Sequence, residues 1–282
     1  ELAVKMARKY WFEKGYPNKF EIITFEGSFH GRSSAGIAAT ASEKMTKGFG
    51  PLLPGFININ LNDHEAIKAT VSEKTAAILI EPIQGEGGIR VLPEPFLKEI
   101  RAICDEKNIL LILDEVQCGV GRTGKLFAHE WVEIEPDIMM VAKGIGGGFP
   151  LGAVLAKENA ASGMTAGTHG STYGGNPLGC SIGLKVIDII SDPDFLYDVN
   201  RKAKLFRDGL MELLKKNTSI FEEVRGKGLM LGLKCKVKNI DVVNAGYSNK
   251  LLTVPAGDNV VRLLPPLTIS DKDINEALNK LD

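Results

Sequence analysis

The chain has 282 residues, of which 44% are hydrophobic and 24% are charged, and its formal net charge is -1. This length allows a large domain with a smaller second one, and the composition is that of an ordinary soluble protein. Because there is no basic excess, nucleic acid and acidic membrane surfaces are excluded as main partners. No apolar run approaches the roughly 20 residues that a transmembrane helix needs.

The cysteines and the first residues indicate the setting of the chain. The four cysteines are widely spaced and form no Cys-x-x-Cys pair, which favours free thiols in a reducing compartment, the cytoplasm. The chain begins at Glu1 without an initiator Met, and Leu2, Met6 and Tyr10 recur at helical spacing without a cap. We therefore expect the N-terminal part of the large domain to lie before Glu1.

Apolar strands and amphipathic helices alternate over most of the chain. The patterns predict strands at 20–25, 75–80, 109–113, 137–141 and 153–156, and helices at 63–71, 95–107, 177–190 and 195–216. A first helix is expected to open the chain and to end before a turn at 15–18. Segment 40–55 is expected to be irregular. Such alternation implies right-handed βαβ units, and hence an α/β fold with a mainly parallel sheet flanked by helices.

The pattern changes near Thr218. Strands are predicted at 228–234 and 260–264, and Ser270 is expected to cap a final helix. We therefore predict a large domain at 1–217 and a small C-terminal α+β domain at 218–282.

Two charged residues follow buried strands in the middle of the chain. Asp114 ends the strand at 109–113, and Lys143 follows the strand at 137–141 and precedes a glycine-rich run. Ligands of parallel sheets bind at the carboxyl ends of the strands, so the two residues are candidates for one site. A partly desolvated lysine attacks aldehydes, and a fixed carboxylate keeps a ring nitrogen protonated. Pyridoxal phosphate (PLP) requires both groups.

The segment 119–125 matches the phosphate-binding motif G-x-x-x-x-G-K. Leu126 follows it and has no hydroxyl for a magnesium ion, and the next residues do not predict a strong helix. A P-loop nucleotide hydrolase is therefore the weaker hypothesis.

Seven blocks occur in a fixed order along the chain: FEGSFHGR, EPIQGEGG, LDEVQCGVGRTG, PDIMMVAKGIGGGFPLGA, GTHGSTYGGNPLG, RGKGL and VVRLLPPL. Together they resemble the class III (ω-amino acid) PLP-dependent aminotransferases. The resemblance covers nearly the whole chain and implies PLP-dependent transferase fold type I. It also implies that a loop binding the PLP phosphate precedes Glu1.

The resemblance implies a cofactor role for several residues. Lys143 would form the Schiff base and carry the proton, and Asp114 would hold the pyridinium. Phe29 and Val116 would contact the two faces of the ring, and Gln117 would bind its phenolic oxygen. The functional unit would be a homodimer with shared active sites. In it, Ser171 and Thr172 would contact the phosphate of the partner's cofactor across the interface.

The resemblance also implies the substrates. Arg32 and Arg262 would bind substrate carboxylates. Glu86 would pair with Arg262 while the amine donor is bound and release it for 2-oxoglutarate, and Glu81 is expected to support its loop. Within this family, the resemblance implies N2-acetylornithine as the amine donor, with ornithine, succinylornithine or 4-aminobutyrate as alternatives.

Two further expectations concern metal binding and a non-catalytic role. His30, His64, His129 and His169 have no metal-ligand spacing, so we expect no metal site. The hypothesis that the chain is a non-catalytic PLP-binding paralogue stays open, although the presence of Lys143, Asp114 and Gln117 disfavours it.

Overall fold

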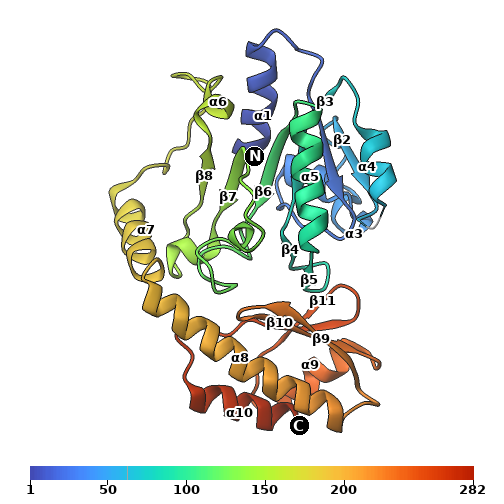
Figure 1. Ribbon diagram of the computed structural model, residues 1–282, viewed down its shortest axis with the longest axis vertical. Coiled ribbons are helices and arrows are strands. Elements are labelled where there is room, and N and C mark those ends of the chain that lie inside the picture. The colour runs from blue at the N-terminus through green and yellow to red at the C-terminus, as the bar shows by residue number, and fades with distance from the viewer. Residues whose placement is uncertain (62) are drawn as a thin grey trace. The chain divides into compact units, whose positions relative to one another are not determined.

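The structure is a computed structural model that describes residues 1–61 and 63–282; the side chain of His64 also lies outside the description. The chain forms two compact units (Figure 1). The first comprises 1–82, 93–117 and 132–186, and the second comprises 83–92, 118–131 and 187–282. The predicted division into domains 1–217 and 218–282 stays a prediction.

The first unit is built on a six-stranded sheet of order β2-β1-β3-β6-β7-β8. Its strands are β1 (Glu21–Phe25), β2 (Phe56–Ile59), β3 (Thr75–Ile80), β6 (Leu110–Asp114), β7 (Ile138–Val141) and β8 (Ala153–Ala156). All neighbours pair in parallel except β7 and β8, which are antiparallel. The mainly parallel α/β sheet is therefore confirmed.

The central strands of this sheet are apolar on both faces, and helices bury them. The helices are α1 (Leu2–Glu13), α2 (Ser34–Thr40), α3 (Glu43–Thr46), α4 (His64–Thr70), α5 (Glu94–Glu106) and α6 (Glu158–Ala161). All six residues of β3 are buried. Trp11 of α1 packs in the core and donates its indole N–H to the carbonyl of Ala76 at 2.9 Å. Asp63 caps α4, which lies in the helix predicted at 63–71, whereas segment 40–55, expected to be irregular, contains α3.

The second unit holds a four-stranded antiparallel sheet of order β11-β12-β10-β9. Its strands are β9 (Phe221–Lys227), β10 (Met230–Cys235), β11 (Val254–Ala256) and β12 (Val260–Leu263), beside a small hairpin of β4 (Ile83–Gln84) and β5 (Arg90–Val91). The helices are α8 (Pro193–Lys216), α9 (Asn239–Ser248) and α10 (Asp271–Leu281), and α7 (Pro177–Ile190) precedes them.

The core of this unit lies between its sheet and its long helices. Phe206 and Leu210 of α8 pack with Leu231 and Leu233 of β10. Helices α8 and α10 lie side by side (Figure 1), and Ser270 caps α10 as predicted. The sequence analysis did not predict strands β2, β4, β5, β9 and β11 or helices α2, α6 and α9.

Candidate active site

Four loops leave the same edge of the six-stranded sheet. Strands β1, β3, β6 and β7 run in parallel, so their carboxyl ends share one edge. Phe29, Glu81, Asp114 and Lys143 lie at or just beyond these ends. This is the edge where parallel sheets bind ligands.

Asp114 is a buried and fixed anion at the end of β6. Its side chain is 6% exposed, and Oδ1 accepts a hydrogen bond from the backbone N–H of Val116 at 3.1 Å. Nδ1 of His30 lies 2.8 Å from Oδ2. The backbone N–H of His30 donates in turn to Oγ1 of Thr40 at 3.0 Å. These contacts hold the carboxylate in one orientation.

Lys143 lies three residues beyond Met140, the residue of β7 that pairs with Asp114. It opens the short 3-10 helix η2 (Lys143–Gly146) with a φ of +48°, a left-handed conformation that is uncommon for residues other than glycine. Such strained backbone clusters at functional sites. Its side chain is exposed, so the partial desolvation expected from the sequence is not provided by this chain.

Glu81 holds the loop that follows β1. The backbone N–H of Phe29 donates to Oε1 of Glu81 at 2.8 Å, and Glu81 is buried. The sequence analysis expected Glu81 to support its own loop, whereas this contact supports the loop after β1. Arg32 is exposed, and its Cζ lies 5.6 Å from the centre of the Phe29 ring. Val116 and Gln117 are half-buried beside Asp114 in the sequence.

Ser171 and Thr172 lie in the exposed loop before α7. Oγ of Ser171 accepts a hydrogen bond from the backbone N–H of Gly174 at 3.0 Å, which bends the loop locally. Both hydroxyl residues are exposed to solvent. The predicted contact with a partner's cofactor stays a prediction.

The second unit contains the ion pair expected between Glu86 and Arg262. Nη1 of Arg262 donates to Oε1 of Glu86 at 2.5 Å. The Arg262 side chain is 9% exposed and sits in β12, whereas that of Glu86 is 41% exposed. The pair therefore joins a buried cation to a partly exposed anion. Its role in substrate exchange stays a prediction.

The P-loop hypothesis is wrong for segment 119–125. No α-helix follows the segment; the next element is the 3-10 helix η1 (Ala128–Trp131). Arg122 donates to the carbonyls of Leu229 and Pro265, and a Cβ on Gly228 would lie 2.4 Å from the carbonyl carbon of Thr123. The segment is therefore packed as scaffold within the second unit.

The sequence analysis missed the contact between His30 and Asp114, because it considered His30 only as a metal ligand. A signal was present, since an acid at the end of a buried strand needs a donor and His30 follows another strand of the same sheet. Among the described residues, no cluster of His, Cys, Asp and Glu could hold a metal ion. Within the same described part, no helix is long and apolar enough to cross a membrane.

Comparisons with known proteins agree over the whole chain. The family model of the class-III aminotransferases matches residues 1–282. An acetylornithine aminotransferase of Rhodobacter capsulatus is 66% identical over 282 residues, covering 100% of this chain and 72% of that protein. One of Mesorhizobium japonicum is 55% identical over 281 residues, covering 100% of this chain and 70% of that protein.

Solved structures show the same similarity. The ornithine aminotransferase of Toxoplasma gondii has a TM-score of 0.94 and 33% identity, covering 100% of this chain and 68% of that one. The N-acetylornithine aminotransferase of Stenotrophomonas maltophilia has a TM-score of 0.83 and 36% identity, covering 100% and 70%.

Proposed function

The chain belongs to the class-III aminotransferases, a PLP-dependent family, and we propose that it transfers the δ-amino group of N2-acetylornithine to 2-oxoglutarate, a step of arginine biosynthesis. The observation that carries the proposed donor is the 66% identity to an acetylornithine aminotransferase over the whole chain. The strand-end acid and lysine at one edge of the sheet support the chemistry.

The residues present fit PLP. Asp114 is a buried carboxylate oriented by the N–H of Val116 and by His30, as a partner for a protonated pyridine nitrogen must be. The exposed amine of Lys143 is accessible to an aldehyde. When bound, PLP supplies an electron sink for the substrate carbanion. Phe29, Val116 and Gln117 would hold its ring.

Lys143 would also move the proton. Once freed by the substrate amine, the amine of Lys143 would take the proton from the substrate carbon that bears the nitrogen and would deliver it to C4′ of the cofactor. Asp114 would stay in place throughout, because the N–H of Val116 and the ring of His30 hold its two oxygens.

Arg262 and Glu86 would allow one site to bind the amine donor and 2-oxoglutarate in turn. While the amine donor reacts, the ion pair masks the charge of Arg262; when 2-oxoglutarate enters, Glu86 rotates away and the guanidinium binds a carboxylate with two parallel hydrogen bonds. Arg32 would bind the other carboxylate. A pair that is partly exposed is weak enough to open in this way.

The functional unit that we propose is a homodimer in the cytoplasm. The exposure of Ser171 and Thr172 supports a contact with the partner's cofactor phosphate. Hydroxyl groups and loop N–H groups suit a phosphate.

Turnover with 2-oxoglutarate tests the donor. The purified holoenzyme is assayed with N2-acetylornithine, ornithine, succinylornithine and 4-aminobutyrate, and kcat/KM is expected to be highest for N2-acetylornithine. A higher value for another donor would reassign the substrate within the family. No turnover of any of the four would favour the non-catalytic paralogue.

A further inference from the structure

The loop that carries Glu86 meets a second loop of the same unit at very short range. Loop 85–89 joins β4 to β5, and turn 257–259 joins β11 to β12. The backbone N–H of Gly257 donates to the carbonyl of Glu86 at 2.7 Å. A Cβ on Gly88 would lie 2.6 Å from the Gly257 oxygen, and one on Gly257 would lie 2.9 Å from the Glu86 oxygen. Only glycine permits this approach.

The far end of loop 85–89 is anchored in an apolar core. Ile89 is fully buried and packs with Ile83, Met230 and Val260. Its φ of +51° is a rare conformation for a β-branched residue, which persists only where the surroundings enforce it. The backbone on this side of Glu86 is therefore fixed by packing.

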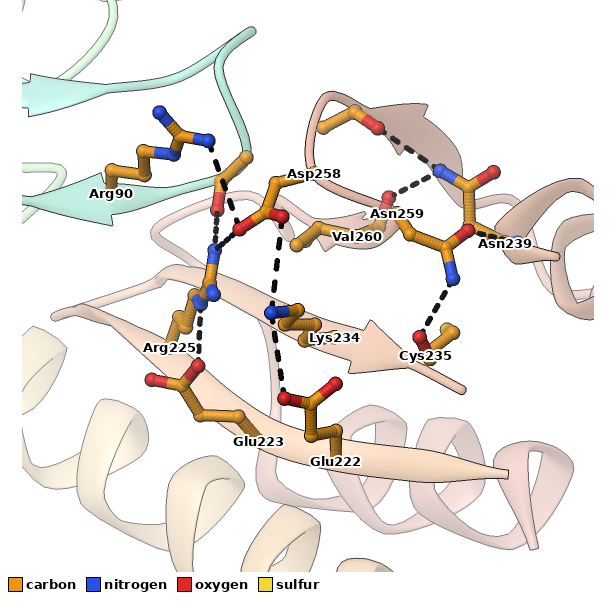
Figure 2. A network of polar contacts seen from close by, with 12 residues as sticks. Arg90, Glu222, Glu223, Arg225, Lys234, Cys235, Asn239, Asp258, Asn259 and Val260 are labelled. Carbon is orange, nitrogen blue, oxygen red and sulfur yellow. Dashed lines mark hydrogen bonds and ion pairs between the residues drawn. The ribbon is translucent and has the colours of Figure 1, made fainter. Parts of the chain in front are cut away.

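Arg225 of β9 ties the two loops together with one guanidinium group (Figure 2). Its Nη1 donates to Oδ2 of Asp258 at 2.6 Å and to the carbonyl of Gly88 at 3.3 Å. Its Nε donates to Oε2 of Glu223 at 2.7 Å, which sets the orientation of the planar group. Asp258 lies in turn 257–259, so Arg225 binds the turn through a side chain and loop 85–89 through its backbone.

The turn is itself held on its other side. Nδ2 of Asn259 donates to the carbonyl of Cys235 at 2.6 Å, and Nζ of Lys234 lies 3.8 Å from Oδ1 of Asp258. Burial acts to raise the pKa of Asp258, but the hydrogen bond from Arg225 and the charges of Arg225, Lys234 and Arg90 outweigh it and lower the pKa. Asp258 is therefore ionised at neutral pH.

We propose that the Arg225–Asp258 pair is a positioning device that fixes the backbone of loop 85–89, so that Glu86 reaches Arg262 and the ion pair opens by rotation of the Glu86 side chain alone. The inference deepens the proposed function and rests on it. Arg225 and Asp258 act only through Glu86. The contrast in exposure supports this arrangement, because the partly exposed Glu86 side chain can rotate into solvent at less cost than the buried Arg262 side chain.

Equilibrium binding of glutarate tests the proposal without turnover. This dicarboxylate has neither amine nor carbonyl, and it must displace Glu86 to reach Arg262. In the holoenzyme, Asp258→Asn and Arg225→Lys are expected to tighten glutarate binding about threefold to tenfold, because a mispositioned Glu86 competes less well. Asp271→Asn, which breaks the exposed ion pair with Arg201 elsewhere in the unit, is the matched control and leaves the affinity unchanged.

A double-mutant cycle separates positioning from a general structural role. In a Glu86→Gln background, Asp258→Asn is expected to have no further effect on glutarate affinity, because the competing carboxylate is already gone. Thermal melting confirms that each variant is folded, and Arg225→Lys carries the test if Asp258→Asn does not fold. Pair variants that bind glutarate no tighter than the unaltered enzyme, or an Asp258→Asn effect that persists without Glu86, overturn the proposal.

The half-reactions distinguish this proposal from the proposed function. Asp258→Asn is expected to lower the rate constant for the amine donor more than that for 2-oxoglutarate, because only the donor needs Arg262 masked. If the unaltered enzyme does not transfer the amino group of N2-acetylornithine, the proposed function fails while the glutarate titration still decides the positioning role. If it does transfer the group and the titration shows no change, the positioning role alone fails.

Discussion

Nδ1 of His30 lies 2.8 Å from Oδ2 of Asp114, and the two side chains are 2% and 6% exposed. A carboxylate can only accept, so Nδ1 carries the hydrogen of this contact. Nε2 of His30 is buried with no hydrogen-bond partner among the described residues. The imidazole therefore serves Asp114 alone within the part of the chain described.

Replacement of His30 tests this support. His30→Phe keeps a ring of similar size but removes a hydrogen bond to a buried charged group, so the free energy of unfolding is expected to fall by about 1.5–3 kcal/mol. PLP affinity should fall with it, because Asp114 loses the partner that orients its Oδ2. Urea unfolding and cofactor titration measure the two effects. His169→Phe, at an exposed contact with Lys5, is the control; an equal loss there would contradict the account.

Arg262→Lys tests carboxylate recognition. Lysine keeps the charge but loses the planar fork, so kcat/KM for 2-oxoglutarate is expected to fall by the equivalent of about 2 kcal/mol, roughly thirtyfold. The half-reaction with the amine donor should change less. Arg201→Lys, in an exposed ion pair, is the matched control. Equal losses in both half-reactions would remove the specific role of Arg262.

Gly88→Ala tests the close approach of the two loops. Gly88 has a φ of +110°, and its new methyl group would meet the Gly257 oxygen. Backbone strain of about 1–2 kcal/mol and overpacking of about 1–3 kcal/mol are expected to add. Gly15→Ala is the control, since Gly15 has a φ of +84° with nothing within 4 Å of a Cβ and retains only the strain. Similar losses in the two variants would show that the approach is not tight.

Cys104 gives a pH dependence of stability. Burial raises the pKa of its thiol from 9.0 to about 12. The unfolded chain loses this proton at lower pH than the folded chain. The contribution of this thiol to the free energy of unfolding is therefore fully present below about pH 9 and is lost as the pH rises toward 12. At pH 10 the loss from this group is about 1.4 kcal/mol.

Unfolding in urea at pH 8 and pH 10 measures the effect. Cys104→Ala is expected to lose less stability between the two pH values than the unaltered chain, whatever its stability at pH 8. Cys180→Ala, at an exposed thiol, should keep the full decline. A decline of the same size in Cys104→Ala and the unaltered chain would exclude the buried thiol as its source.

The sequence predicted best the elements whose burial pattern is simple. The run at 75–80 became β3 with its predicted bounds, because six consecutive buried residues suit only a strand covered on both faces. In contrast, β9 was missed. It carries Glu222, Glu223 and Arg225, and its charged residues form ion pairs on an edge strand instead of an alternating apolar pattern.

Only those features of the site that depend on local sequence or on family resemblance could be predicted. Asp114 and Lys143 were found because each ends a buried strand, and the Glu86–Arg262 pairing came from family resemblance. The contact of His30 with Asp114, and that of Arg225 with Gly88 and Asp258, join segments 84, 137 and 33 residues apart. Periodicity carries no information on such long-range pairs.

The proposed chemistry requires that Lys143 holds PLP as a Schiff base. The most direct measurement combines the visible absorption of the holoenzyme with borohydride reduction and mass mapping of the peptides. We expect a visible band that Lys143→Ala abolishes, and a reduced pyridoxyl group on the peptide that contains Lys143. A Lys143→Ala enzyme that keeps the band, or a pyridoxyl group on another lysine, would contradict the account.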